Sequence, residues 1–318
     1  MIVRTVLGDI APDELGATYL HEHLIIDSPL VADRLPHIRL PSADDAVAEL
    51  MDCVRAGAGA MVDAMPCASG RDVMRLAAVS KRAGVHVIAT TGLHTPKFYP
   101  GHRWALEASA DVLAELFVAD IETGIDRFDY TGPVVERTDH RAGILKIVTS
   151  GTTITERDRR LFEAAAITHE RTGVPILTHC EEGVGAPEQL ALLAELGVPL
   201  TRVVLSHTDK ITDPTLHKEL LSSGVNLEYD QALRQATDEE PATARLLAEM
   251  IAAGFLGQLM LGTDGARRTL WATLGGTPGL AWLLTGFTAI LASHGIDADA
   301  RRELLVANPA RFLAMEAT

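Results

Sequence analysis

Two histidines lie two positions apart near the start of the chain, in the stretch His21-Glu22-His23. The residues around them are mainly apolar or β-branched, and a turn-forming Asp-Ser-Pro follows, which predicts a buried strand that ends in a loop. Side chains two apart on a strand point to the same side, so both imidazoles would share one face. Such a pair can hold a divalent metal ion, although two hydrogen-bonded histidines at a strand end would fit the same pattern.

Four more residues with metal-binding chemistry accompany apolar runs further along the chain. Lys146 lies inside one such run, where an unpaired ammonium group would be costly. His179, His207 and Asp264 each follow a short apolar run. Four histidines, an aspartate and a lysine exceed the about four ligands of one tetrahedral ion, and therefore favour two ions that share a bridge. Two ions together can activate a water molecule and polarise the oxygen of the bond that is cleaved.

An alternation of short apolar strands with amphipathic helices would position these residues. Strands are expected at 18–25, 60–65, 85–92, 143–148, 174–179, 202–207, 224–229 and 258–263, and helices at 43–57, 70–83, 108–125, 155–172, 187–196, 213–223 and 241–254. The pattern predicts an α/β fold, a (β/α)8 TIM barrel, with a doubly wound open sheet as the alternative. The sequence has no internal repeat or linker, so residues 1–318 are expected to form a single domain.

Net charge and cysteine content limit the kinds of binding partner and the cellular compartment that we expect for this protein. The net charge of −15 argues against nucleic acid and anionic membranes, which would need a basic surface, but it allows a small-molecule substrate. The three cysteines are sparse and odd in number, which suits a reducing compartment, and we expect a cytoplasmic protein. We find no signal-peptide pattern, and no apolar run approaches the roughly 18 residues of a membrane span.

The ligand series beginning with His21-Glu22-His23 resembles that of the binuclear amidohydrolase superfamily, and within it the chain resembles the phosphotriesterase family, including its lactonase members. Segments such as Gly70-Arg-Asp-Val73 and Asn308-Pro-Ala-Arg-Phe-Leu313 carry the resemblance over almost the full length. It implies a distorted (β/α)8 barrel and a homodimer. The more buried metal ion would be bound by His21, His23 and Asp264, and the more exposed one by His179 and His207.

The resemblance also implies roles for the bridge and the base. Lys146 would be carboxylated by CO2 and bridge the two divalent ions, for which Zn²⁺ is favoured and Mn²⁺ or Co²⁺ also suit. A metal-bridging hydroxide would attack the substrate carbonyl. Asp264 would be both ligand and catalytic residue, because it would take the proton from the bridging water.

Departures from the family pattern point to the substrate. Gln231 and Lys210 stand where phosphotriesterases carry a histidine and an aspartate that relay protons, so phosphotriester hydrolysis is at most a side activity. Arg234 and Arg267 stand where related sugar lactonases bind a phosphate, and guanidinium groups suit phosphate or carboxylate. The favoured substrate is a furanose or related lactone, with or without a phosphate group.

Other readings of the sequence stay open. His94 and Tyr99, with Lys97 in the same loop, are further candidates for substrate contact, although exposed loop residues would look the same. Trp271 is either a lid residue that contacts substrate or a loop anchor. The same metal site could serve an aryl esterase, a phosphotriesterase or an amidohydrolase, or a non-catalytic binding protein that retains the metals.

Overall fold

The computed structural model describes residues 1–316, and its centre is an eight-stranded sheet whose strands pair in chain order. All neighbouring strands within this sheet are parallel. The strands are β3 (Ala17–Glu22), β4 (Ala58–Asp63), β5 (His86–Gly92), β6 (Ala142–Thr149), β7 (Ile176–Cys180), β8 (Val203–Ser206), β9 (Asn226–Tyr229) and β10 (Leu259–Leu261). Each predicted strand is present, with its bounds shifted by a few residues.

The sheet closes on itself just beyond β10. The backbone N–H groups of Thr263 and Asp264 donate to the carbonyl of His21 over 3.1 and 2.9 Å, which joins the end of the last strand to the first. Because the two edges meet, the predicted (β/α)8 barrel is confirmed and the open doubly wound sheet is excluded. Closure also carries Asp264 directly to the end of β3, where both N-terminal histidines lie.

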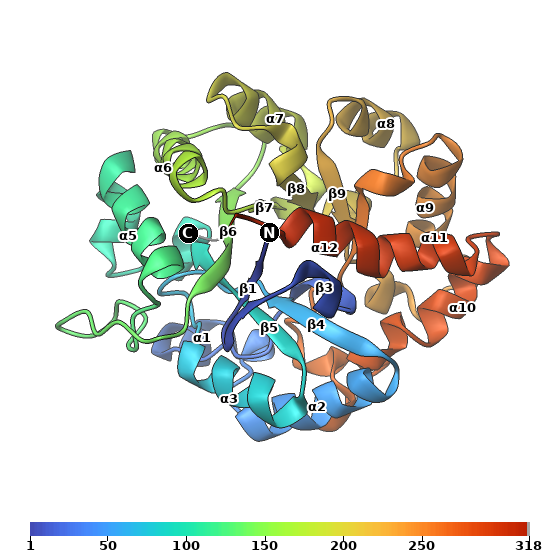
Figure 1. Ribbon diagram of the computed structural model, residues 1–318, viewed down its shortest axis with the longest axis horizontal. Helices are drawn as coiled ribbons and strands as arrows, with labels where there is room; N and C mark the ends of the chain where they lie inside the picture. Colours follow the sequence, from blue (N-terminus) through green and yellow to red (C-terminus); the bar gives the residue numbers. More distant parts are fainter. Residues whose placement is uncertain (317–318) are drawn as a thin grey trace.

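A ring of helices surrounds the barrel (Figure 1). The seven predicted helices form as α2 (Ala43–Arg55), α3 (Val73–Ala83), α5 (Ala110–Glu122), α6 (Glu156–Thr172), α7 (Ala186–Glu195), α8 (Pro214–Ser222) and α9 (Ala242–Ala252). Two of these helices start at residues of the types that favour an N-cap: the Ser42 and Thr155 side chains accept from backbone N–H groups in the first turns of α2 and α6. Five shorter helices were not predicted, namely α1 (Pro29–Arg34), α4 (Arg103–Glu107), α10 (Gly286–Ser293), α11 (Ala298–Arg302) and α12 (Asn308–Leu313).

A hairpin and a C-terminal helix cover the end of the barrel that lies away from the candidate site. A hairpin of β1 (Val3–Thr5) and β2 (Gly8–Ile10), which the sequence analysis missed, and helix α12 lie across the ring in Figure 1. A Cβ at Gly143 would lie 2.2 Å from the carbonyl oxygen of Arg4, so only glycine lets β6 approach the hairpin this closely. Val3 of the hairpin and Leu313 of α12 join the apolar side chains that fill the barrel interior: Leu20, Val62, Ile88, Ile144, Leu177, Val204 and Met260.

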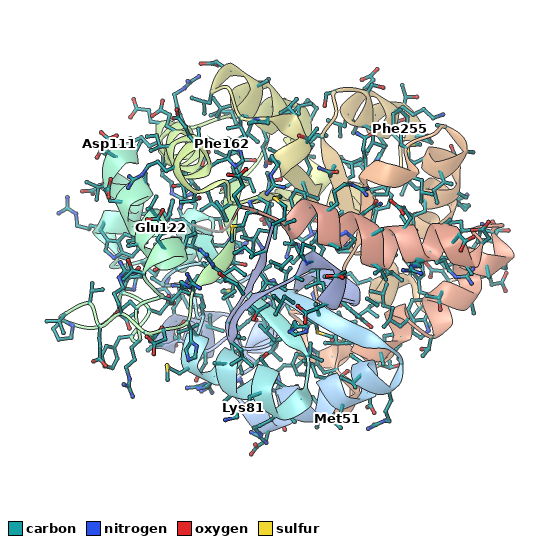
Figure 2. The ribbon with its side chains drawn as sticks, viewed as in Figure 1. Met51, Lys81, Asp111, Glu122, Phe162 and Phe255 are labelled. Atoms are coloured by element: carbon teal, nitrogen blue, oxygen red, sulfur yellow. The ribbon has the colours of Figure 1, made fainter. Side chains whose placement is uncertain are left out.

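The outer faces of the helices carry charged side chains, such as Lys81 on α3 and Asp111 on α5 at the rim in Figure 2. Within residues 1–316, no helix has both the length and the apolar character needed to cross a membrane. The three cysteines are buried and free. The free cysteines agree with their sparse, odd number in the sequence.

Candidate metal centre

The structure brings all six predicted ligands to the wall of one small cavity. It has a volume of about 70 Å³ and lies at the carboxyl ends of the strands, where the sites of such barrels are found. The six residues come from five different places in the barrel: His21, His23, Lys146, His179, His207 and Asp264. Apolar side chains, including Met65 and Phe98, complete the wall. Residues that are up to 243 positions apart in sequence, from His21 to Asp264, therefore meet at one point.

On the buried side, donor atoms from three elements converge. The Nζ of Lys146 lies 3.1 Å from Nε2 of His21. The Oδ1 atom of Asp264 lies 3.4 Å from Nε2 of His23 and 4.0 Å from Nε2 of His21. As predicted from the strand pattern, the two histidine rings lie on the same side of the chain, with centroids 5.4 Å apart.

On the more open side, two imidazole nitrogens face each other. Nδ1 of His179 lies 2.8 Å from Nε2 of His207. The cavity wall therefore carries several lone-pair donors close together. They are the Lys146 amine, the imidazole nitrogens and the Asp264 carboxylate. Such a donor set fits divalent transition-metal ions, and it is too large for a single tetrahedral ion. The residues present therefore fit the binuclear site that the family implies.

Lys146 is fully buried, as the apolar run around it predicted. Burial lowers its pKa to about 8, and the nearby carboxylates, Asp264 first among them, offset only part of this effect. A substantial fraction of the amine is therefore neutral in mildly alkaline solution, which is the form that can react with CO2.

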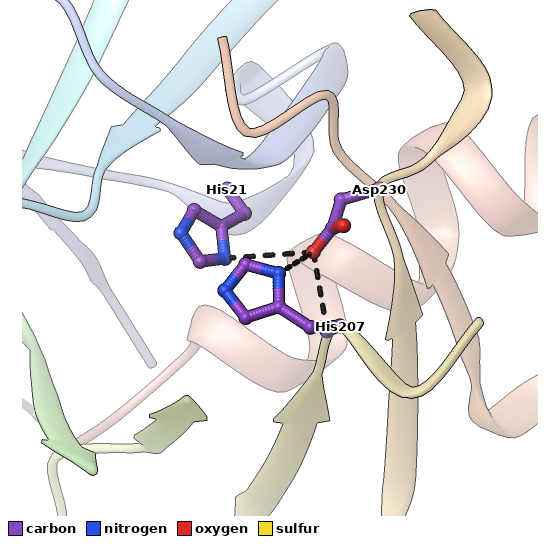
Figure 3. Close-up of side chains that lie close together, drawn as sticks. All are labelled: His21, His207 and Asp230. Carbon is purple, nitrogen blue, oxygen red and sulfur yellow. Dashed lines mark hydrogen bonds and ion pairs between the residues drawn. The ribbon is translucent and has the colours of Figure 1, made fainter. Parts of the chain in front are cut away.

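Asp230 is a buried carboxylate that the sequence analysis missed. Its Oδ2 lies 2.5 Å from Nδ1 of His207 and accepts from the backbone N–H of the same residue over 3.1 Å; it also lies 4.0 Å from Nδ1 of His21 (Figure 3). His207 has a φ of 64°, so Asp230 holds it in a backbone conformation that is unfavourable for this residue type. Asp230 comes directly after β9, and the rule that selected His179 and His207 would have found it.

A second buried acid, Glu228 on β9, lies beneath the histidines. Its Oε2 is 3.7 Å from Nδ1 of His21, and within residues 1–316 neither of its carboxyl oxygens has a hydrogen-bond partner. Burial and the neighbouring Asp230 raise the pKa of Glu228 well above its usual value, which favours the neutral form of this carboxyl group.

Asp264 is fixed by contacts on both sides. Its φ is 43°, and the Glu22 carboxyl group accepts from the Thr263 hydroxyl and, over 3.2 Å, from the Gly265 N–H. Arg234 donates to Asp264 Oδ2 over 2.9 Å, which leaves Oδ1 turned toward the histidines. Burial alone would raise the pKa of Asp264, but Arg234 and the neighbouring histidines hold it well below its usual value, so the residue is an anion.

A wider pocket of about 470 Å³, which we call the mouth pocket, shares His94, His179 and Asp264 with the wall of the small cavity. Arg234 and Arg267 line it, together with Lys97, Lys210 and Gln231. Three of the donor groups of Arg234 are directed at the Asp264 carboxylate and at the carbonyls of Thr263 and Asp264. Lys97 pairs with Glu181. Within the described part of the chain, Lys210 and Arg267 form no ion pair, so these two cations are available to an anionic ligand.

The remaining substrate candidates have different surroundings. His94 is buried and lines both the cavity and the mouth pocket. Tyr99 is also buried, but its hydroxyl accepts from the His94 N–H and donates to the Cys67 carbonyl, and it lines neither space. Trp271 is buried, and its Nε1 donates to the Gly265 carbonyl over 2.7 Å, a contact that fits the loop-anchor alternative. The positions of Tyr99 and Trp271 therefore give no support to direct substrate contact.

Known proteins that are similar to this chain belong to a family of metal-dependent hydrolases, which agrees with a metal-binding cavity. A family model described as "Phosphotriesterase family" matches residues 1–313, so the chain belongs to the phosphotriesterase family, as its sequence predicted. A phospho-furanose lactonase of Mycoplasmopsis synoviae is 32% identical over 98% of this chain and 92% of its own. The match covers almost the whole chain, and the family consists of metal-dependent hydrolases.

Two solved structures are similar over nearly the whole fold. A lactonase from Listeria monocytogenes aligns with a TM-score of 0.91, 25% identity and complete coverage of both chains. The phosphotriesterase homology protein of Escherichia coli, described with phosphate in its active site, aligns with a TM-score of 0.86 and 29% identity over 95% of this chain and 100% of its own.

Proposed function

We propose that this protein is a binuclear metal-dependent lactonase that opens a furanose or related lactone carrying a phosphate or another anionic group. The observation that carries the proposal is the convergence of six donor side chains on one cavity, which shares part of its wall with a pocket where Lys210 and Arg267 form no ion pair within residues 1–316. The names of the relatives, a phospho-furanose lactonase and a lactonase, support the same reaction class.

His21, His23 and Asp264 would hold one ion and His179 and His207 the other, with Lys146, carboxylated by CO2, between them. We favour Zn²⁺, and Mn²⁺ or Co²⁺ also suit these ligands. When bound, such a pair supplies Lewis acidity that activates a water molecule and polarises a carbonyl oxygen.

The chain's own groups have separable roles in this proposal. The Asp264 carboxylate accepts the proton of the attacking water, while Arg234 keeps its Oδ2 atom in place. Lys210 and Arg267 attract the anionic group of the substrate, and His94 lines its path. Gln231 donates to Asp230 and does not extend a proton relay from Asp264. For the whole protein we propose a cytoplasmic homodimer.

The test is a panel that pairs phosphorylated with plain sugar lactones and adds aryl phosphotriesters and N-acyl amino acids. We expect the highest kcat/KM for a phosphorylated lactone, and loss of activity after chelation that returns with Zn²⁺, Mn²⁺ or Co²⁺. Full activity in the His21→Ala/His23→Ala double variant would contradict the proposal, and so would a holoprotein inactive on every lactone.

The preference for a phosphorylated over a plain lactone gives a sharper test of the roles of Lys210 and Arg267. Arg267→Ala and Lys210→Ala each remove a charged contact that contributes about 1.5–3 kcal/mol, so KM for a phosphorylated lactone should rise about ten- to a hundredfold. KM for the plain lactone should change little. Arg245→Ala on α9 and Lys218→Ala on α8 remove exposed cations outside the pocket and serve as matched controls.

A further inference from the structure

Glu181 contacts the side of His179 that faces away from the cavity. Nδ1 of His179 is directed at His207, and its other ring nitrogen, Nε2, lies 2.7 Å from Oε2 of Glu181. Glu181 begins a short 3-10 turn, η4 (Glu181–Gly183), directly after β7. Strand and turn together place the acid two residues beyond the histidine, within hydrogen-bond distance of its ring.

The second oxygen of Glu181 is also engaged. Oε1 accepts from Nζ of Lys97 over 3.2 Å, and Lys97 lies in η3 (Pro96–Phe98), the 3-10 turn after β5. The same loop packs the His94 ring against the His179 ring, with centroids 5.1 Å apart. Two βα loops thus meet at His179, and the contact between them includes a charged pair.

The other histidine on the open side is held in the same manner. Asp230 lies against Nδ1 of His207, which leaves Nε2 of that ring directed at His179. Both imidazoles of the more exposed ion therefore have a carboxylate on the nitrogen that points away from their partner. A carboxylate in this position fixes the tautomer and the ring orientation of a metal-binding histidine.

We propose that Glu181 is the positioning residue of His179. It accepts the Nε2–H proton, so that the Nδ1 lone pair points to the more exposed ion, and Lys97 holds the Glu181 carboxylate in place. This inference rests on the proposed metal centre. The pair also explains how an acid is tolerated in a pocket meant for an anionic substrate, because Lys97 balances its charge.

The test measures metal binding, with no substrate involved. Wild type, Glu181→Gln, Glu181→Ala and Lys97→Met are titrated against a chromogenic chelator with Zn²⁺, and bound metal is counted by elemental analysis. Removing the partner of a ligating histidine typically weakens a metal site 10- to 100-fold, so Glu181→Ala should lose affinity by about that factor for one of its two ions and keep the other. Glu181→Gln can still accept from Nε2–H and should lose less, and Lys97→Met less again.

Glu182→Gln is the matched control, because Glu182 is the adjacent acid and forms no ion pair within residues 1–316. It should bind both ions as wild type does. The visible spectrum of the Co²⁺-loaded protein gives a second readout, and it should change in Glu181→Ala and not in Glu182→Gln. The near-isosteric Glu181→Gln covers the case in which the alanine variant does not fold.

Two results would overturn the inference: wild-type affinity for both ions in Glu181→Ala, or equal losses in the Glu181 and Glu182 variants. Failure of the proposed function is a separate outcome. In that case wild type would bind two ions, and Glu181→Ala would still bind one of them more weakly, while no lactone is hydrolysed.

Discussion

At the scale of single residues, Lys146 has the most unusual surroundings. It is a buried amine with an imidazole nitrogen at 3.1 Å and carboxyl groups nearby. An ordinary ammonium in this place would repel the ions that the other donors fit. A carbamate would turn the same side chain into an anionic ligand with two oxygens, which resolves the conflict between its type and its position.

This assignment predicts a pH dependence for metal loading. The folded pKa of Lys146 is about 8, lowered from 10.5 by burial, so the neutral amine increases as pH rises through 8. About one amine in a hundred is neutral at pH 6 and about nine in ten at pH 9. At constant dissolved CO2, reconstitution of the apoprotein with Zn²⁺ should therefore be faster at pH 9 than at pH 6.

The measurement is the rate at which activity returns, with and without added bicarbonate. Lys146→Met, which keeps an apolar side chain of similar length, should show no response to bicarbonate and should retain less metal. A bicarbonate-independent rate in wild type would argue against a carbamate.

Asp264 supports a second prediction at this scale. Asp264→Asn keeps the size of the side chain but removes the proton acceptor, so kcat should fall at least about 100-fold, with a smaller change in KM. Steady-state kinetics on the preferred lactone checks this, with Asp238→Asn, an exposed loop residue, as the control. An unchanged kcat would show that the proton is taken by another group.

At the scale of elements, the sequence determines the barrel strands well and the connections poorly. The runs around Lys146, His179 and His207 are apolar because those strands are buried on both faces, and such runs are visible in a single sequence. The β1–β2 hairpin consists of two three-residue strands, which are too short for a periodic pattern. Asp230 follows the strand-end rule, whereas Glu181 lies in the turn after β7, and neither its contact with the His179 ring nor the Lys97 side chain that holds it, 84 residues away, can be predicted from a sequence pattern.

The long segment after β10 is the clearest example of a connection whose structure the sequence does not predict. From the sequence, Trp271 in this segment is either a lid residue or a loop anchor, and nothing reveals the buried acid that fixes the conformation of the loop. Glu49 on α2 accepts from the Thr273 N–H and hydroxyl over 2.9 Å each and from the Leu280 N–H over 2.8 Å. The loop next to Asp264 is therefore attached to a helix on the outside of the barrel and to Glu22 on the inside.

Glu49→Ala should release this loop. It leaves buried N–H groups without an acceptor, and hydrogen bonds to a charged group contribute about 1.5–3 kcal/mol each, so the free energy of unfolding should fall by at least about 2 kcal/mol. Urea unfolding gives the change in stability, and limited proteolysis should show new cleavage between residues 266 and 280. Glu219→Ala, at an exposed site on α8, should stay within about 0.5 kcal/mol of wild type.

At the scale of the whole molecule, the proposed metal ligands come from strands all around the ring. The six donor side chains lie on or shortly after β3, β6, β7, β8 and β10, so bound ions would add links between strands that are not neighbours in the barrel. Ions that bind only the folded state stabilise it by mass action. The single-domain organisation and the homodimer stay predictions.

Metal removal should therefore lower the melting temperature in one cooperative step. With free Zn²⁺ 1,000-fold above its Kd, each site contributes about 4 kcal/mol. Calorimetry of the holoprotein and the chelator-treated protein measures the difference, and a single domain predicts one transition in both. Two separate transitions in the holoprotein would contradict the single-domain prediction.

The packed barrel interior and the hairpin beneath it also decide how small molecules travel. Apolar side chains from Val3 to Leu313 close the far end, so whatever reaches the ions must leave by the opening through which it arrived. The hydroxy acid made by ring opening would keep the anionic group of its parent and gain a carboxylate. It would thus meet Lys210 and Arg267 again on its way out, and turnover would be governed by departure as much as by ring opening, with product competing against incoming substrate.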